Sequence, residues 1–184
     1  MIYLSRLMFL SLLIFNCIYG GDLSSQHVSP PYVEMAGKIR SEIAQMLAKR
    51  YNMKIFGISG GMADCVNMLG LDFQIQGPLP KEQLRRILIE SVHELLEAVN
   101  SNQQIRPFLK NYPFTEKEII TTLFVIDKNR ENVFDPEILV ASSYHGRLIF
   151  NTKDKAVKYG YKQEIKEDYE TALKIVLEEN KKQH

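Results

Sequence analysis

The eight residues Ile119–Ile126 constrain the fold of this 184-residue chain more than any other segment. They are β-branched and apolar at positions that face both sides of a strand, a pattern typical of the centre of a sheet. A central strand needs paired neighbours and a helical layer that buries its apolar side chains. The remaining segments must therefore supply strands and covering helices.

Two segments before this strand predict helices. Val33 to about Tyr51 carries apolar residues at helical spacing. Pro80 to about Asn100 carries them over a wider arc, and Pro80 suits the first position of a helix. The wide arc indicates that the second helix lies across the sheet as its central helix.

The other periodic segments predict strands and one more helix. Met62–Ile75 alternates as a strand does, with Gly70 as a possible bulge. His145-Gly146 predicts a two-residue hairpin turn between strands at 137–144 and 147–152. A short strand near 159–165 and a helix over about 166–179 complete the chain. The predicted fold class is α+β, an antiparallel β-sheet with helices packed mainly on one face.

The beginning of the chain predicts export. Arg6 precedes an apolar run, Leu7 to Phe15, which is shorter than the roughly 20 residues of a membrane-spanning helix and matches a signal-peptide core. We therefore expect a signal peptide over 1–20, a flexible tether over 21–32 and a single α+β domain over 33–184. The expected location is periplasmic, lipid-anchored to the cell envelope, or secreted.

The site of leader cleavage has two interpretations. Gly20 and Gly21 suit an ordinary signal peptidase. Leu13-Ile-Phe-Asn-Cys17 resembles a lipobox, the bacterial motif whose cysteine is acylated and becomes the first residue of a lipoprotein. Asn16 and the bulky Phe15 depart from that motif. Two alternatives therefore stay open: Cys17 is lipidated, or Cys17 is removed together with the leader.

Charge and cysteine content limit the classes of partner. The 23 basic residues become 22 once Arg6 is removed, equal to the 22 acidic residues, so there is no electrostatic reason to expect nucleic acid. A membrane is expected only through the possible lipid anchor. Cys65 is then the sole cysteine of the exported domain, and its position in an apolar alternation favours a core role.

One motif offers a catalytic alternative. Gly57-Ile-Ser-Gly-Gly61 matches G-x-S-x-G, and Asp127 or Asp135 and then His145 follow in hydrolase order. The alternative function is therefore an exported serine hydrolase using Ser59, Asp127 and His145. Such a nucleophile lies between a strand and a helix, whereas a strand follows here. No metal-ligand spacing or nucleotide-binding motif occurs in the sequence, so no cofactor and no metal are predicted.

The segment from Asn100 to Thr115 interleaves aromatic residues with prolines. We expect Phe108 and Phe114 to cover the end of the core, Arg106 to bind backbone carbonyls, and Tyr112 to face outward. Together with Gly60-Gly-Met62, this segment resembles a family of small exported bacterial proteins. The resemblance implies export and no particular activity. The predicted function is a non-catalytic binding module for an unknown protein or envelope component, with Arg106 and Tyr112 as candidate binding residues.

The lipobox interpretation is testable at Cys17. If this thiol is acylated, a metabolic lipid label should enter the protein and disappear in Cys17→Ser, which should move from the membrane to the soluble fraction. An unlabelled mature protein beginning at Gly21 or Asp22 would contradict acylation.

Overall fold

The computed structural model describes residues 29–182. Arg6, the apolar run, Cys17 and the signal peptide lie outside this range, as does most of the tether, so those predictions stay open. The elements are α1 (Pro31–Arg50), β1 (Lys54–Met62), β2 (Val66–Gln76), α2 (Lys81–Ser101), a short 3₁₀ helix (Arg106–Phe108), β3 (Ile119–Ile126), β4 (Ile138–Tyr144), β5 (Arg147–Thr152), β6 (Gln163–Asp168) and α3 (Tyr169–Lys181).

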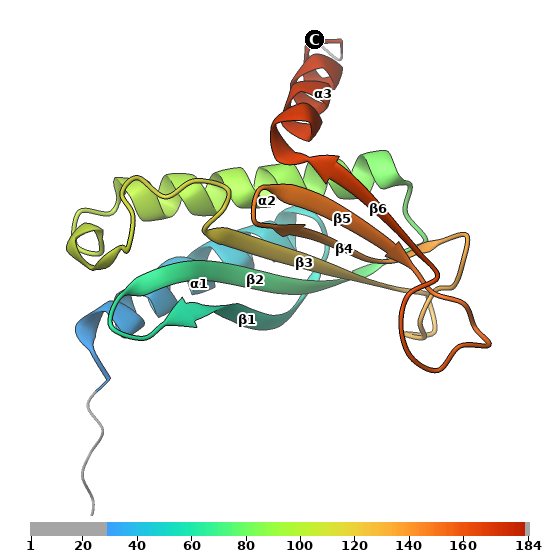
Figure 1. Cartoon of the computed structure of the whole chain (residues 1–184), viewed down its shortest axis with the longest axis horizontal. Coiled ribbons are helices and arrows are strands. Elements are labelled where there is room, and N and C mark those ends of the chain that lie inside the picture. Colours follow the sequence, from blue (N-terminus) through green and yellow to red (C-terminus); the bar gives the residue numbers. More distant parts are fainter. Residues whose placement is uncertain (1–28, 183–184) are drawn as a thin grey trace, which may run out of the picture.

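The described strands form one sheet in sequence order, β1 to β6 (Figure 1). All neighbours pair antiparallel except β2 and β3, which run parallel. Parallel neighbours need a crossover connection, and α2 with the loop after it provides that connection. The predicted α+β class is confirmed, with this one parallel pair in a mostly antiparallel sheet.

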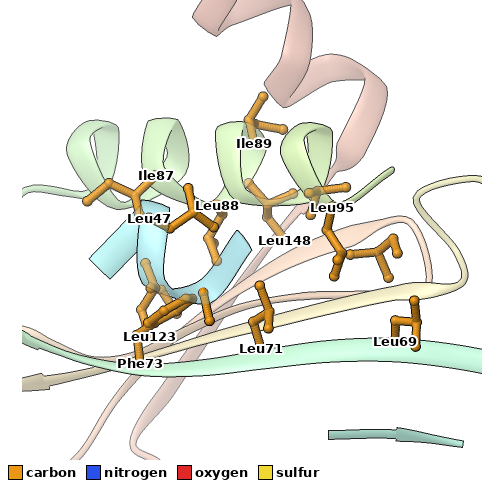
Figure 2. Packing of buried hydrophobic residues seen from close by; sticks show 14 of the residues in the cluster. Leu47, Leu69, Leu71, Phe73, Ile87, Leu88, Ile89, Leu95, Leu123 and Leu148 are labelled. Carbon is orange, nitrogen blue, oxygen red and sulfur yellow. The ribbon is translucent and has the colours of Figure 1, made fainter. Parts of the chain in front are cut away.

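Helices α1 and α2 cover the same face of the sheet (Figure 1). Alternate strand residues point toward them and are buried, for example Leu71, Phe73 and Leu123. Figure 2 shows Leu88 and Leu95 of α2 pointing toward the strand residues, with Leu47 of α1 in the same layer. The core therefore lies between the helices and one face of the sheet, as the wide apolar arc of α2 predicted.

An ion-pair cluster joins α2 to the edge strand β6. The Arg85 guanidinium donates to both carboxylate oxygens of Glu167, at 2.6 and 2.8 Å, and Lys81 lies 2.9 Å from the same carboxylate. The side chains of Arg85 and Glu167 are only 7% and 15% exposed. These hydrogen bonds, led by that from Arg85, lower the pKa of Glu167 to about 2.

Three local predictions need correction. Cys65 lies half-buried in the turn between β1 and β2, since β1 ends at Met62 and β2 begins only at Val66. Gly70 is not a bulge but pairs regularly with Ser59 and Ile120, and the Ser59 side chain lies where a Cβ of Gly70 would be. The last strand begins at Gln163 and the last helix at Tyr169, both later than predicted, and the helix begins there because Asp168 caps α3 by accepting a hydrogen bond from the Thr171 N–H.

The loop between α2 and β3 covers one end of the core. Phe114 is buried, and Phe108 is half-buried with its ring 5.5 Å from that of Tyr32. The Asn100 side chain holds this loop by accepting from the Phe114 N–H at 2.8 Å and donating to its carbonyl at 3.0 Å. Tyr112 is exposed, as the sequence predicted.

The burial of Phe114 makes this loop testable by thermal unfolding. Phe114→Ala should cost about 3–5 kcal/mol in free energy of unfolding, because a buried ring leaves a cavity. Phe108→Ala should cost less, since its ring is half-buried. Tyr112→Ala, the control on the same loop, should unfold nearly as the unchanged protein does. Equal melting temperatures for the Phe114 and Tyr112 variants would contradict the buried placement.

The ion pair at β6 predicts a dependence of stability on pH. The Glu167 pKa is below its ordinary value of 4.5. The contribution of this carboxylate to the free energy of unfolding is therefore full above about pH 4.5 and is lost as the pH falls toward 2. Glu167→Gln should lose about 3 kcal/mol near neutral pH, because the guanidinium of Arg85 remains buried without its partner. Urea unfolding from pH 7 to pH 2 measures this difference.

The matched control is Glu97→Gln on α2, whose side chain is 71% exposed. It should leave the pH profile nearly unchanged. Equal profiles for the two variants would mean that the Arg85–Glu167 pair does not hold β6 to α2.

Candidate binding groove on the helix-free face

The face of the sheet opposite α1 and α2 carries a mixed set of polar and aromatic side chains. Strand register places Gln74, Phe124 and Val140 in one row across β2, β3 and β4. Asp72 and Thr122 lie in the next row. Most of these residues are half-buried, and the face therefore offers both apolar surface and hydrogen-bonding groups to a ligand.

A bulge in β1 brings a further aromatic ring onto this face. Ile55 pairs with Phe73 and Gly57 with Asp72, so Phe56 is an extra residue in β1. A bulge turns a side chain in a new direction. The Phe56 ring lies against that of Phe124, with centroids 5.0 Å apart.

The loop between β5 and β6 closes one end of this face into a groove of about 500 Å³. Its walls are Phe56 and Phe124 on the sheet side and Tyr159 and Tyr161 on the loop side, and both tyrosines are exposed. The remaining lining residues are Gln74, Val125, Ile126, Asn132, Leu139, Val140, Lys153, Lys158 and Gly160. The groove has the size and mixed character of a small-ligand site.

Four cations line this groove and the hollow beside it. Lys153 and Lys158 line the groove itself. Lys54 and Arg130 line the adjoining hollow, which shares Gln74 and Ile126 with the groove. No aspartate or glutamate is among the lining residues of either, and within residues 29–182 none of the four cations has an ion-pair partner.

The loop that carries the tyrosines is tied to the sheet at its base. Asp135 accepts from the Thr152 hydroxyl at 2.9 Å and from the Lys162 ammonium at 2.5 Å. The hydrogen bond from Lys162 lowers the pKa of Asp135, so the carboxylate stays charged in mildly acidic solution. The Lys162 N–H donates to the Thr152 carbonyl at 2.9 Å. The base of the loop that forms this wall of the groove is therefore fixed to the sheet.

The structure does not bring the three hydrolase residues together. Ser59 lies within β1, and its hydroxyl is 3.4 Å from a carboxylate oxygen of Asp72. Asp127 follows the end of β3, whereas His145 forms the hairpin beside the start of β3, about 25 Å away at the usual rise of a strand. Three strand spacings, about 14 Å, separate β1 from β4. Asp135 is the loop anchor described above.

The predicted binding residues Arg106 and Tyr112 are in contact. The Arg106 guanidinium lies 4.3 Å from the centroid of the Tyr112 ring, a cation–π geometry, instead of binding carbonyls as predicted. Both side chains are exposed on the loop that covers the core. Their role in binding stays a prediction.

Sequence patterns gave little indication of the groove. Its residues come from β1, from β2 to β4, from the loop between β3 and β4 and from the loop at 153–161, which are far apart in the chain. A local sign existed in Tyr159-Gly-Tyr161, two tyrosines around a glycine in a segment rich in lysine. The prediction of a short strand near 159–165 obscured this sign, because the structure places these tyrosines in the loop before β6.

Comparisons of this chain with protein-family models, curated proteins and solved structures give no match. Within residues 29–182, no helix has both the length and the apolar character needed to cross a membrane. The same part of the chain holds no group of three histidine, cysteine, aspartate or glutamate side chains placed to bind a metal ion. The groove is the candidate site because of its own lining, in which aromatic side chains lie beside lysines.

Proposed function

We propose that this protein is an exported binding module of the cell envelope. Its ligand is anionic with an apolar body, and it occupies the groove on the helix-free face. The observation that carries the proposal is the combination of aromatic walls with two cations in the groove and two in the adjoining hollow, with no carboxylate in the lining of either.

The arrangement of charge supports an anionic ligand. The whole chain has a net charge of only +1, so the cations of the groove are a local feature. Groups of like charge beside apolar walls concentrate the electric field in a cleft and attract an ion of opposite sign. Lys158 also lies 5.2 Å from the ring centroid of Tyr159, which keeps its ammonium group beside the aromatic wall.

The aromatic side chains support an apolar part in the ligand. Phe56 and Tyr159 are largely exposed, although burying such rings is favourable. An apolar group between the two walls would remove both from water. The amides of Gln74 and Asn132 could then fix its orientation through hydrogen bonds.

Binding explains this site better than catalysis does. Covalent catalysis needs a nucleophile within hydrogen-bond reach of its base. Ser59 and His145 are separated by strands of the sheet, which leaves the serine-hydrolase alternative without a geometric basis. The proposal of export depends on the leader, through Arg6 and the apolar run after it.

The sulfonated aromatic dye ANS is a direct probe of such a groove. The folded protein should bind it at one saturable site with enhanced fluorescence. Lys153→Gln combined with Lys158→Gln should weaken binding about tenfold, equivalent to about 1.4 kcal/mol, because the sulfonate loses two nearby cations. Phe56→Ala should also weaken it, and about 1 M salt should weaken binding to the unchanged protein.

Lys174→Gln on α3 is the matched control, since this exposed lysine lies outside the groove lining. Equal dye affinity in the control and the double variant would contradict the proposed site. So would fluorescence that rises without saturation.

A further inference from the structure

The outer edge of β1 has the composition of an interior strand. β1 ends the sheet, and Figure 1 shows no described strand beyond it. Ile55 and Ile58, which pair with core residues of β2, are 40% and 57% exposed. Phe56, on the opposite face, is 59% exposed. Apolar side chains on both faces are typical of a strand with a neighbour on each side.

The other edge of the sheet is protected in the usual way. β6 reads Gln163-Glu-Ile-Lys-Glu-Asp168, and charged side chains along an edge discourage pairing with another chain. β1 carries no charged residue after Lys54. The two edges of this one sheet therefore differ in charge, and Lys54 and the bulge at Phe56 are the features of the first half of β1 that oppose a further strand.

Two glycines of β1 are not explained by packing among residues 29–182. Gly60 has φ of 132°, and a side chain there would meet the backbone of β2, so its glycine is required by the fold. Gly57 and Gly61 lack such a φ, and an added Cβ would find only ordinary contacts. Glycine inside a strand often marks a place where another backbone approaches closely.

The groove begins at this edge. Phe56 belongs both to β1 and to the groove wall, and Lys54, at the start of β1, lines the adjoining hollow. Farther along β1, the buried guanidinium of Arg40 donates to the Ser59 carbonyl at 3.1 Å and occupies that acceptor. The first half of β1, residues 54–58, lies next to the cations and before this occupied carbonyl, and it includes the bulge at Phe56.

From this placement we infer that β1 accepts an extended acidic peptide of a partner protein as an added strand. The inference rests on the proposed function and names the ligand class of the same site. Side chains of the added strand that face the groove would contact Phe56, and a carboxylate beside them would approach Lys54 and Arg130. Backbone hydrogen bonds would supply affinity. The contacts of the peptide side chains with Phe56, Lys54 and Arg130 would supply selectivity.

Charge favours such a peptide over a second copy of this chain. β1 of another copy would bring a further Lys54 and no carboxylate to the cations of the hollow. A peptide with one or two acidic residues would neutralise them. The occupant is therefore a segment in which acidic and apolar residues alternate.

A displayed library of random peptides of about ten residues, long enough for a strand and its flanks, tests the inference. Selection on the purified protein should enrich sequences with alternating apolar residues, an acidic residue and no proline within the paired part. Ile58→Lys should reduce their affinity at least about tenfold, because charge at an edge opposes strand addition. Ile165→Lys places the same change on β6 and should leave affinity unchanged.

Backbone methylation of a selected peptide separates strand pairing from contact of side chains alone. In an added strand, alternate N–H groups face β1 and the others face solvent. N-methylation of one alternate set should therefore abolish binding, whereas methylation of the other set should change affinity by less than about twofold.

The peptide experiments test strand addition, whereas dye binding tests the groove, so the two proposals can fail separately. Peptides that tolerate methylation at every position and bind Ile58→Lys normally would overturn strand pairing while leaving the dye result intact. An empty selection, with dye binding intact, would also overturn it. If the unchanged protein self-associates and Ile58→Lys abolishes this, the occupant of the β1 edge is a second copy of the chain. That result would overturn the assignment of an acidic peptide as the occupant.

Discussion

The packing of α2 along one face of the sheet is the interaction on which the rest of this structure depends. α2 contacts α1, α3 and the strands β3 to β5, and it also connects β2 to its parallel neighbour β3. Most of its apolar residues are fully buried, among them Leu84, Leu88, Val92 and Leu95. At about 1.5–3 kcal/mol for each buried aliphatic side chain, this face is a main source of stability.

One-sided packing also explains where a ligand can bind. α1 and α2 occupy the same face, so the opposite face remains open to solvent and to the loop between β5 and β6. That loop is anchored where Asp135 binds Thr152 and Lys162, and it ends in exposed tyrosines. The groove thus results from the placement of both helices on one face of the sheet. Its formation requires no change in the packing of the core.

The two edges of the sheet are stabilised differently. β6 is held by the nearly buried pair between Arg85 and Glu167 and carries a charged outer row. β1 is held mainly by its pairing with β2 and by α1 beneath it. Its first half therefore keeps free backbone groups and exposed apolar side chains, which is the arrangement that strand addition requires.

The sequence by itself determined the elements whose signal is local. The two long helices, the central strand at Ile119–Ile126 and the hairpin at His145-Gly146 match the structure closely, because helical spacing, alternation and turn chemistry are properties of neighbouring residues. The exposed Tyr112 and the buried Phe114 followed from the same kind of evidence.

Only the tertiary structure decided the parallel pairing of β2 with β3, the bulge at Phe56 and the groove. The order of segments along the chain does not state which strands are neighbours. It therefore could not show that Phe56 and Tyr159, about a hundred residues apart, line one groove. The distance between Ser59 and His145 was equally hidden, because it depends on the strands lying between them. Long-range pairing results from burial of the whole core, which a local pattern does not encode.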